Sequence, residues 1–305
     1  MTRHLLTISA LDADTLRALI ARGRHHAAEP DPVSRRLLAG HSVAQLFYEP
    51  STRTRCSFEL AARRLGADVL NLDIDTTSAV KGETVVDTAR TLAAMGIKLF
   101  VIRHSDSDVI AETADALPTG CAVLNAGAGS QQHPTQALLD MLTLDEAGFR
   151  FEQLDISIVG DIRRSRVANS AIEALSLLGT KRIRLGGPGG FLPDRLPDTV
   201  ERHDSLATAI EGADVVMTLR IQRERMLADE TLDTADYHRH WGLSEERLKE
   251  HAPKARVMHP GPMNRGVEID SAVADGPRSL ILDQVRNGVA ARMAALEWLA
   301  KENKQ

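Results

Sequence analysis

Apolar and polar positions along the chain follow two periods, one typical of buried strands and the other of amphipathic helices. Short apolar runs predict two series of strands, which lie at 42–47, 68–72, 99–102 and 122–124, and then at 155–159, 182–185, 215–219 and 256–258. Helical patterns lie between and around them, at 12–24, 52–65, 83–95, 107–116, after Pro134, at 166–178, near 205–210, at 244–251 and at about 283–301. Strands that alternate with helices imply parallel sheets covered by helices on both faces.

The gap between the two series predicts the domain organisation. We expect an α/β fold of two doubly wound parallel-sheet domains with the active site between them. The first domain is expected to comprise residues 1–133 and 283–305, and the second domain residues 153–282. A linking helix and loop are expected at residues 134–152.

Composition narrows the class of protein. The 305 residues are 43% hydrophobic and 26% charged, which fits a packed globular core. A net charge of −5 argues against general nucleic-acid binding. Cys56 and Cys121 are the only cysteines, so we expect no disulfide framework and a cytoplasmic location. The N-terminal sequence indicates no signal peptide, and no run approaches the roughly 20 apolar residues of a membrane span.

Donor groups follow nearly every predicted strand. In open parallel sheets, ligands bind beyond the carboxyl ends of the strands. The segments found there are 51–55 (STRTR), Arg103 with His104, 125–136 (NAGAGSQQHPTQ), 160–166 (GDIRRSR), Arg220 with Gln222, and 259–266 (HPGPMNRG). Several of these segments also open helices, whose free N–H groups favour anions. The pattern predicts a small substrate with several negative charges.

Each segment also has an ordinary interpretation. Residues 51–55 could be an elaborate helix cap, and His133 could be a plain loop histidine before the helix-starting Pro134. Arg166 could lie on the surface, since Arg163 and Arg164 beside it look solvated. Arg220 could be a charge at the rim of the sheet.

Two rival functions remain at this point. A nicotinamide oxidoreductase would need a glycine pattern after a strand and an acidic residue about 20 positions later, and neither 159–166 nor 185–190 supplies it. A non-catalytic phosphate- or amino-acid-binding protein would not need the full set of Arg53, Arg103, His133 and Arg220.

The order of three motifs is more specific than any one of them. The segments 47–59 (FYEPSTRTRCSFE), 133–140 (HPTQALLD) and 259–269 (HPGPMNRGVEI) resemble the catalytic chains of the aspartate carbamoyltransferase family, over essentially the whole chain. The resemblance implies transfer of the carbamoyl group of carbamoyl phosphate to the α-amino group of L-aspartate, a step of pyrimidine biosynthesis. The alternative is a carbamoyltransferase of another amine, such as ornithine.

Two positions separate these alternatives. Ornithine enzymes typically carry a cysteine in the loop where this chain has 133–136 (HPTQ), and a His-Cys-Leu-Pro segment where it has 259–262 (HPGP). Charge agrees with the aspartate type, because Arg166 and Arg220 suit two carboxylates, whereas the ammonium group of ornithine would favour an acidic partner.

The resemblance also implies roles for individual residues. For carbamoyl phosphate these are Ser51, Thr52, Arg53 and Thr54 at the phosphate, Arg103, His133 and Gln136 at the carbamoyl group, and Gly261 and Pro262 in a loop that lines the pocket. For aspartate they are Arg166, Arg220, Gln222 and Lys81, the last from a neighbouring subunit. Catalysis is expected from Arg53, Thr54, Lys81, Arg103 and His133. A loop serine of the family would have to be Thr77 or Ser78 here.

The resemblance further implies a homotrimer. Some relatives form larger assemblies with regulatory chains or dihydroorotase. No cofactor and no metal are expected, and neither nucleic acid nor a membrane is an expected partner.

Overall fold

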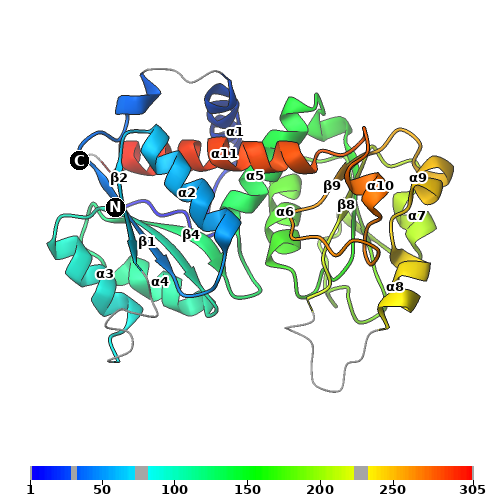
Figure 1. Cartoon of the computed structure of the whole chain (residues 1–305), viewed down its shortest axis with the longest axis horizontal. Helices are drawn as coiled ribbons and strands as arrows, with labels where there is room; N and C mark the ends of the chain where they lie inside the picture. The colour runs from blue at the N-terminus through cyan, green and yellow to red at the C-terminus, as the bar shows by residue number, and fades with distance from the viewer. Residues whose placement is uncertain (1, 29–32, 73–81, 223–232, 304–305) are drawn as a thin grey trace. The chain divides into compact units, whose positions relative to one another are not determined.

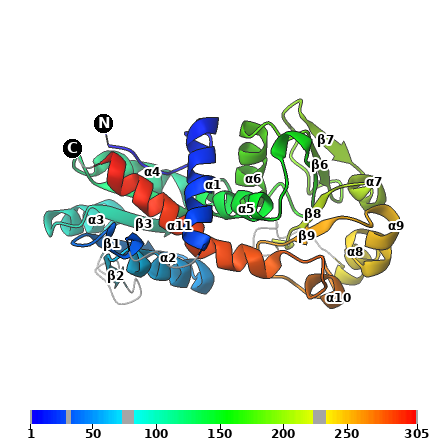
Figure 2. The ribbon, with the colours of Figure 1, turned by 90° about the horizontal axis from the view of Figure 1, so that it is seen from above.

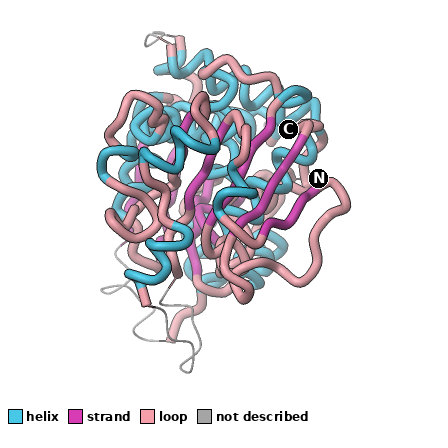
Figure 3. The backbone as a smooth tube through the Cα atoms, turned by 90° about the vertical axis from the view of Figure 1, so that its right-hand side faces the viewer, coloured by secondary structure: helices cyan, strands magenta, loops and turns pink. Residues whose placement is uncertain are grey.

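The computed structural model describes residues 2–28, 33–72, 82–222 and 233–303. Their mutual contacts divide the chain into two units, of which unit 1 comprises Met1–Leu142 with Arg286–Gln305, and unit 2 comprises Thr143–Val285. The predicted α/β class with two parallel sheets is confirmed. Figure 3 shows the strands of both sheets with helices packed around them. The domain boundaries expected from the sequence, and a binding role for each domain, remain predictions.

Unit 1 contains a four-stranded parallel sheet in the order β2-β1-β3-β4. Its strands are β1 (Ser42–Phe47), β2 (Asp68–Leu72), β3 (Leu99–His104) and β4 (Ala122–Ala128). Its helices are α1 (Ala13–Ala27), η1 (Ser34–Arg36), α2 (Thr52–Arg64), α3 (Val85–Ala94), α4 (Ser107–Ala116) and the first part of α5 (Pro134–Glu146), with most of α11 (Ile281–Glu302). The chain leaves β1 for β2 on one side and returns to β3 on the other, so β1 and β3 flank the switch point.

Helices cover the two faces of this sheet. On one face, Leu46 and Phe100 of the strands pack with Val85 and Leu92 of α3 and with Ile110 of α4. Figure 1 shows α3 and α4 together on this side of the sheet, with α2 and α11 on the other. The alternation of side chains along each strand divides the apolar positions between the two faces.

The N-terminal and C-terminal helices of unit 1 cross each other, as Figure 2 shows for α1 and α11. Glu297 of α11 is 2% exposed and accepts hydrogen bonds from Arg22 Nε at 2.6 Å, His26 Nε2 at 2.7 Å and Lys301 Nζ at 2.5 Å. These donors hold the pKa of Glu297 well below its usual range, although burial acts in the opposite direction. The carboxylate therefore joins α1 to α11 through charge-assisted hydrogen bonds.

Unit 2 contains a five-stranded parallel sheet in the order β7-β6-β5-β8-β9. Its strands are β5 (Asp155–Val159), β6 (Arg182–Gly186), β7 (Val200–His203), β8 (Val215–Thr218) and β9 (Arg256–Met258). Its helices are η4 (Phe151–Gln153), α6 (Arg166–Leu177), α7 (Leu206–Ile210), α8 (Thr234–Trp241), α9 (Glu245–His251) and α10 (Ser271–Ala274). The switch point lies between β5 and β8.

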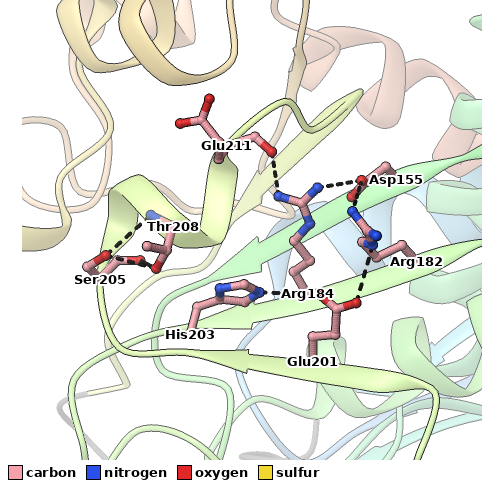
Figure 4. Close-up of polar contacts among 8 residues, drawn as sticks. All are labelled: Asp155, Arg182, Arg184, Glu201, His203, Ser205, Thr208 and Glu211. Carbon is pink, nitrogen blue, oxygen red and sulfur yellow. Dashed lines mark hydrogen bonds and ion pairs between the residues drawn. The ribbon is translucent and has the colours of Figure 1, made fainter.

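Buried charges connect the strands at the opposite end of this sheet (Figure 4). Arg184, in the middle of β6, pairs with Asp155 at the start of β5 and donates from Nη1 to the backbone carbonyl of Glu211 at 2.5 Å. Arg182 bridges Asp155, at 3.3 Å, and Glu201 of β7, at 3.2 Å. Because the buried charges of Asp155 and Arg184 lie beside each other, ion pairs stabilise this end of the sheet.

Candidate functional site

The site residues of unit 1 begin at the N-terminus of α2. Ser51 is the N-cap residue, yet its side chain makes no capping hydrogen bond, so the ordinary interpretation of this segment as a cap does not account for its hydroxyl. Thr52 and Arg53 are exposed, whereas Thr54 is buried. Exposed side-chain donors around the free N–H groups of a helix start form an arrangement that suits an anion.

Arg103 lies at the end of β3, next to this helix start along the sheet edge. Its side chain is 13% exposed, its Nη1 donates to the carbonyl of Ala126 at 3.3 Å, and its Nε lies 3.3 Å from Oε2 of Glu49. Glu49 lies two residues before Ser51, so an ion pair connects the loop that follows β1 to the end of β3. These contacts hold the guanidinium group at the carboxyl end of the strands.

The remaining predicted site residues of unit 1 lie at the start of α5. His133 is 4% exposed and comes directly before α5, and its carbonyl accepts from the backbone N–H of Gln136 at 3.0 Å. Gln136 is 8% exposed and its Nε2 donates to Oδ1 of Asp140, one turn further along the helix, at 3.0 Å. The sequence predicted His133 and Gln136 as site residues and missed Asp140, although the spacing of four residues was visible.

In unit 2, Arg166 and Arg220 lie at the switch point between β5 and β8. Arg166 is the first residue of α6 and is 7% exposed, and Ser165 caps this helix through a bond from the N–H of Ala168. Arg220 follows β8, and its Nη2 lies 3.3 Å from Oε1 of Gln222. Two guanidinium groups at one strand edge are suited to binding carboxylates.

Asp161 anchors the loop that carries Arg220 and Gln222. This carboxylate is fully buried and accepts from the backbone N–H of Gln222 at 3.2 Å and from Nη1 of Arg164 at 3.2 Å. Burial raises the pKa of Asp161, and the two donors partly offset that effect. The prediction that Arg164 is solvated is wrong, because its side chain is 13% exposed, pairs with Asp161 and lies over the ring of Phe191 at 5.7 Å.

The 259–266 segment forms a loop with a buried anchor. His259 is 1% exposed, its Nδ1 accepts from the N–H of Gly261 at 2.8 Å, and its Nε2 lies 3.1 Å from Oε1 of Glu268. Glu268 also accepts from the N–H of Asn264 at 2.6 Å. Because Nδ1 is an acceptor, Nε2 carries the proton and donates to Glu268. The bond between Gly261 and Pro262 is cis.

The structure thus groups most of the predicted residues into two sets. Set 1, in unit 1, comprises Ser51, Thr52, Arg53, Thr54, Arg103, His133 and Gln136; set 2, in unit 2, comprises Arg166, Arg220, Gln222, Gly261 and Pro262. Lys81, Thr77 and Ser78 lie outside the described residues. Of the carboxylates that the sequence analysis missed, Glu49, Asp140 and Asp161 each contact a predicted site residue. Glu268 contacts His259, which in turn accepts from the N–H of Gly261.

The chemistry of the described residues can be bounded further. Among them, no three His, Cys, Asp or Glu side chains gather as they would to hold a metal ion. None of the helices in the described ranges is both long enough and apolar enough to cross a membrane. Cys56 and Cys121 are not joined by a disulfide.

Comparison with known proteins shows the family. Residues 3–146 match the family model "Aspartate/ornithine carbamoyltransferase, carbamoyl-P binding domain", and residues 152–299 match its "Asp/Orn binding domain". The chain belongs to the aspartate/ornithine carbamoyltransferase family, and it is a transferase of this type.

The sequence relatives carry a more specific name. The aspartate carbamoyltransferase catalytic subunit of Stenotrophomonas maltophilia is 50% identical over 304 residues, which cover 97% of this chain and 96% of the relative. The catalytic subunit of Xanthomonas euvesicatoria is 51% identical over 302 residues, with 97% and 96% covered. The aspartate-type motifs found in the sequence and these relatives agree.

Solved structures agree on the fold and separate the two substrates less well. Aspartate transcarbamoylase from Trypanosoma cruzi, in complex with carbamoyl aspartate and phosphate, has a TM-score of 0.86 at 30% identity and covers 97% of this chain and 95% of its own. Ornithine carbamoyltransferase from Thermus thermophilus has a TM-score of 0.85 at 27% identity, with 98% and 99% covered. The backbone alone therefore does not choose between aspartate and ornithine.

Proposed function

We propose that this protein is an aspartate carbamoyltransferase, which converts carbamoyl phosphate and L-aspartate into N-carbamoyl-L-aspartate and phosphate in pyrimidine biosynthesis. The observation that carries the proposal is the identity of about 50%, over 97% of the chain, to relatives named aspartate carbamoyltransferase catalytic subunit. The 133–136 and 259–262 segments, which differ from the ornithine pattern, support it.

We assign carbamoyl phosphate to set 1. The phosphate binds Ser51, Thr52, Arg53 and Thr54 at the start of α2, where hydroxyls, N–H groups and a guanidinium group occur together. Thr54, Arg103 and His133 point donors at the carbonyl oxygen, and Gln136 binds the carbamoyl group. Backbone groups of Gly261 and Pro262 complete the binding of this substrate.

We assign aspartate to Arg166, Arg220 and Gln222 of set 2 and to one residue from a neighbouring chain. Arg166 and Arg220 bind the two carboxylates, and Gln222 supports Arg220 through the contact at 3.3 Å. Lys81 of a neighbouring chain would also reach this substrate, which requires a homotrimer. That the substrates meet between the two units stays a prediction.

The proposed mechanism needs no nucleophile from the protein. The uncharged α-amino group of aspartate attacks the carbamoyl carbon, the carbonyl oxygen becomes an oxyanion, and phosphate leaves and accepts the proton of the amine. Rate comes from holding the reactants in register and from donors aimed at the oxyanion, which are worth on the order of 3 kcal/mol of barrier each. Arg53, Thr54, Lys81, Arg103 and His133 are the residues that we assign to this step.

A colorimetric assay for carbamoylated product tests the proposal. The purified protein is incubated with aspartate or with ornithine, each with and without carbamoyl phosphate. We expect product with aspartate and none with ornithine, and only when carbamoyl phosphate is present. Product from ornithine would move the protein to the alternative, and no product from either amine would support a binding protein.

Light scattering after gel filtration tests the trimer, for which we expect about three chain masses. Mixing inactive Arg53→Ala chains with inactive Lys81→Ala chains should restore part of the activity, since some mixed sites then hold both native residues. Activity that stays absent would argue against a shared site.

We also propose a cytoplasmic location, which fits the two free cysteines.

A further inference from the structure

Behind Gln136 lies a buried pair of opposite charges that no proposed substrate contact uses. Asp140 is fully buried on α5, and Arg292 of α11 is 4% exposed. The side chain of Leu139, next to Asp140, would be 3.5 Å from a Cβ atom on Gly288 of α11, so the two helices pack closely here. The guanidinium group of Arg292 also lies over the ring of Phe58 of α2, at 4.9 Å. Arg292 thus packs α11 against α2, the helix that starts at the 51–55 segment.

Asp140 and Arg292 interact electrostatically in the interior of unit 1. A carboxylate removed from water needs an opposite charge or strong donors. Burial lowers the pKa of Arg292 to about 10, and the charge of Asp140 counters part of this effect. Since a guanidinium group with a pKa near 10 is still protonated at neutral pH, Arg292 supplies the positive charge. The charge of Arg103 also lowers the pKa of Arg292, which locates the pair near the carbamoyl part of set 1.

An ionised carboxylate accepts hydrogen bonds and cannot donate them, so its contact decides which end of a neighbouring amide faces it. Asp140 Oδ1 accepts from Nε2 of Gln136 at 3.0 Å. The other end of that amide, Oε1, is then directed away from Asp140. An oxygen acceptor suits the –NH2 group of a carbamoyl substrate, which offers two donors, whereas the opposite orientation would bring donors against donors.

We propose that Asp140 is a specificity-determining positioning residue that orients the Gln136 amide to select a carbamoyl group over an acetyl group. This inference rests on the proposed function. A site built to accept from a substrate –NH2 group discriminates against an analogue that lacks it, because the acceptor is then left unpaired. Acetyl phosphate is that analogue, with a methyl group in place of the amine.

The test compares three phosphate compounds on the same variants. The measurements are the KM of carbamoyl phosphate, the inhibition constant of acetyl phosphate and the inhibition constant of inorganic phosphate, with aspartate saturating. The amide introduced by Asp140→Asn can donate to Gln136. The side-chain amide of Gln136 can then flip, so that its oxygen faces residue 140. We expect the KM of carbamoyl phosphate to rise about tenfold, while both inhibition constants stay within about twofold of wild type.

A double-mutant cycle with Gln136→Ala shows through which residue Asp140 acts. If Asp140 works by orienting Gln136, Asp140→Asn has no further effect on the ratio of carbamoyl to acetyl binding once Gln136 is alanine. Glu297→Gln is the matched control, because it also removes a buried carboxylate of unit 1, in this case one that contacts only α1 and α11. It should leave the ratio unchanged.

Several outcomes would overturn the proposal. One is that Asp140→Asn changes all three constants by the same factor, which indicates a merely structural role. Another is that Asp140→Asn changes the ratio of carbamoyl to acetyl binding as much in the Gln136→Ala background as in the wild type. If Asp140→Asn does not fold, Asp140→Asn with Arg292→Gln removes both charges and must shift the same ratio. A wild-type protein that forms no carbamoyl-aspartate refutes the proposed function instead; the ratio is then measured by calorimetric binding of carbamoyl and acetyl phosphate.

Discussion

Sets 1 and 2 both lie at the carboxyl ends of the strands of a parallel sheet, but different structures hold them in place. Most of set 1 lies at the starts of two helices, α2 and α5, with the buried charges of Asp140 and Arg292 behind α5. In set 2, Arg166 starts a helix as well, whereas Arg220 and Gln222 lie on a loop that Asp161 holds through a backbone N–H. Of the groups that we place at the reacting atoms, Arg53, Thr54 and His133 are thus set by helix starts and Arg103 by strand β3, whereas a group that only binds substrate can lie on a loop held by one carboxylate.

The strongest way to separate the two sets is to truncate Arg53. Arg53→Ala removes a forked, charged donor from the proposed phosphate site, so the KM of carbamoyl phosphate should rise at least about 100-fold. Steady-state kinetics with each substrate varied measures this change. Arg220→Ala is the matched comparison and should raise the KM of aspartate instead. If both variants raised the same KM, the division of substrates between the sets would be wrong.

His133→Ala should reduce turnover without a comparable loss of phosphate binding. Losing one donor to the oxyanion costs on the order of 3 kcal/mol of barrier, or about 100-fold in kcat. The inhibition constant of inorganic phosphate should change little, because Ser51 to Thr54 remain. Unchanged kcat in this variant would refute the role of His133 in the reaction.

Asp161→Asn tests the anchor of set 2. The amide still accepts from the N–H of Gln222 but loses the charge that pairs with Arg164, so we expect the loop to loosen and the KM of aspartate to rise about tenfold. The KM of carbamoyl phosphate should stay near the wild-type value. An effect on both substrates would show that Asp161 supports the fold rather than the loop.

Glu297→Gln should have the smallest effect on kinetics and a clear effect on stability. Because the pKa of Glu297 is depressed in the folded protein, its ionised form stabilises unit 1 above the unfolded pKa of about 4.3, and this contribution is lost as the pH falls through the folded value. Urea unfolding should show a loss of about 3 kcal/mol at pH 7. The difference between variant and wild type should shrink below about pH 4. A constant difference across this range would contradict the assignment.

Most of the fold was predictable from the sequence, because short apolar runs and helix periods dominate it. Strands 42–47, 68–72, 155–159 and 256–258 have the predicted bounds, and β3 and β4 extend beyond the predicted ends. β7 was missed because only Val200 of its four residues is buried at this sheet edge. α8 was missed because charged and aromatic residues obscure its period, although Asp233 caps it.

The site was predictable only where a residue type carries the chemistry directly. Arginines, hydroxyls and His133 at strand ends are visible in the sequence as donors. The residues that orient them are harder to find, because Asp161 contacts Gln222, 61 positions away, only after folding. Asp140 is the exception, since it lies one helical turn from Gln136. Arg164 shows the same limit, since its burial depends on Phe191, 27 positions away.

Unit 1 is assembled from both ends of the chain, and this imposes an order on its synthesis. Arg3 and Asn303 exchange backbone and side-chain hydrogen bonds at 2.8 and 3.0 Å, and Arg292 lies beside a carboxylate that the ribosome releases some 150 residues earlier. All of unit 2 emerges in between. The contacts of Arg292 with Phe58 and of Glu297 with Arg22 therefore form only after unit 2 has been synthesised.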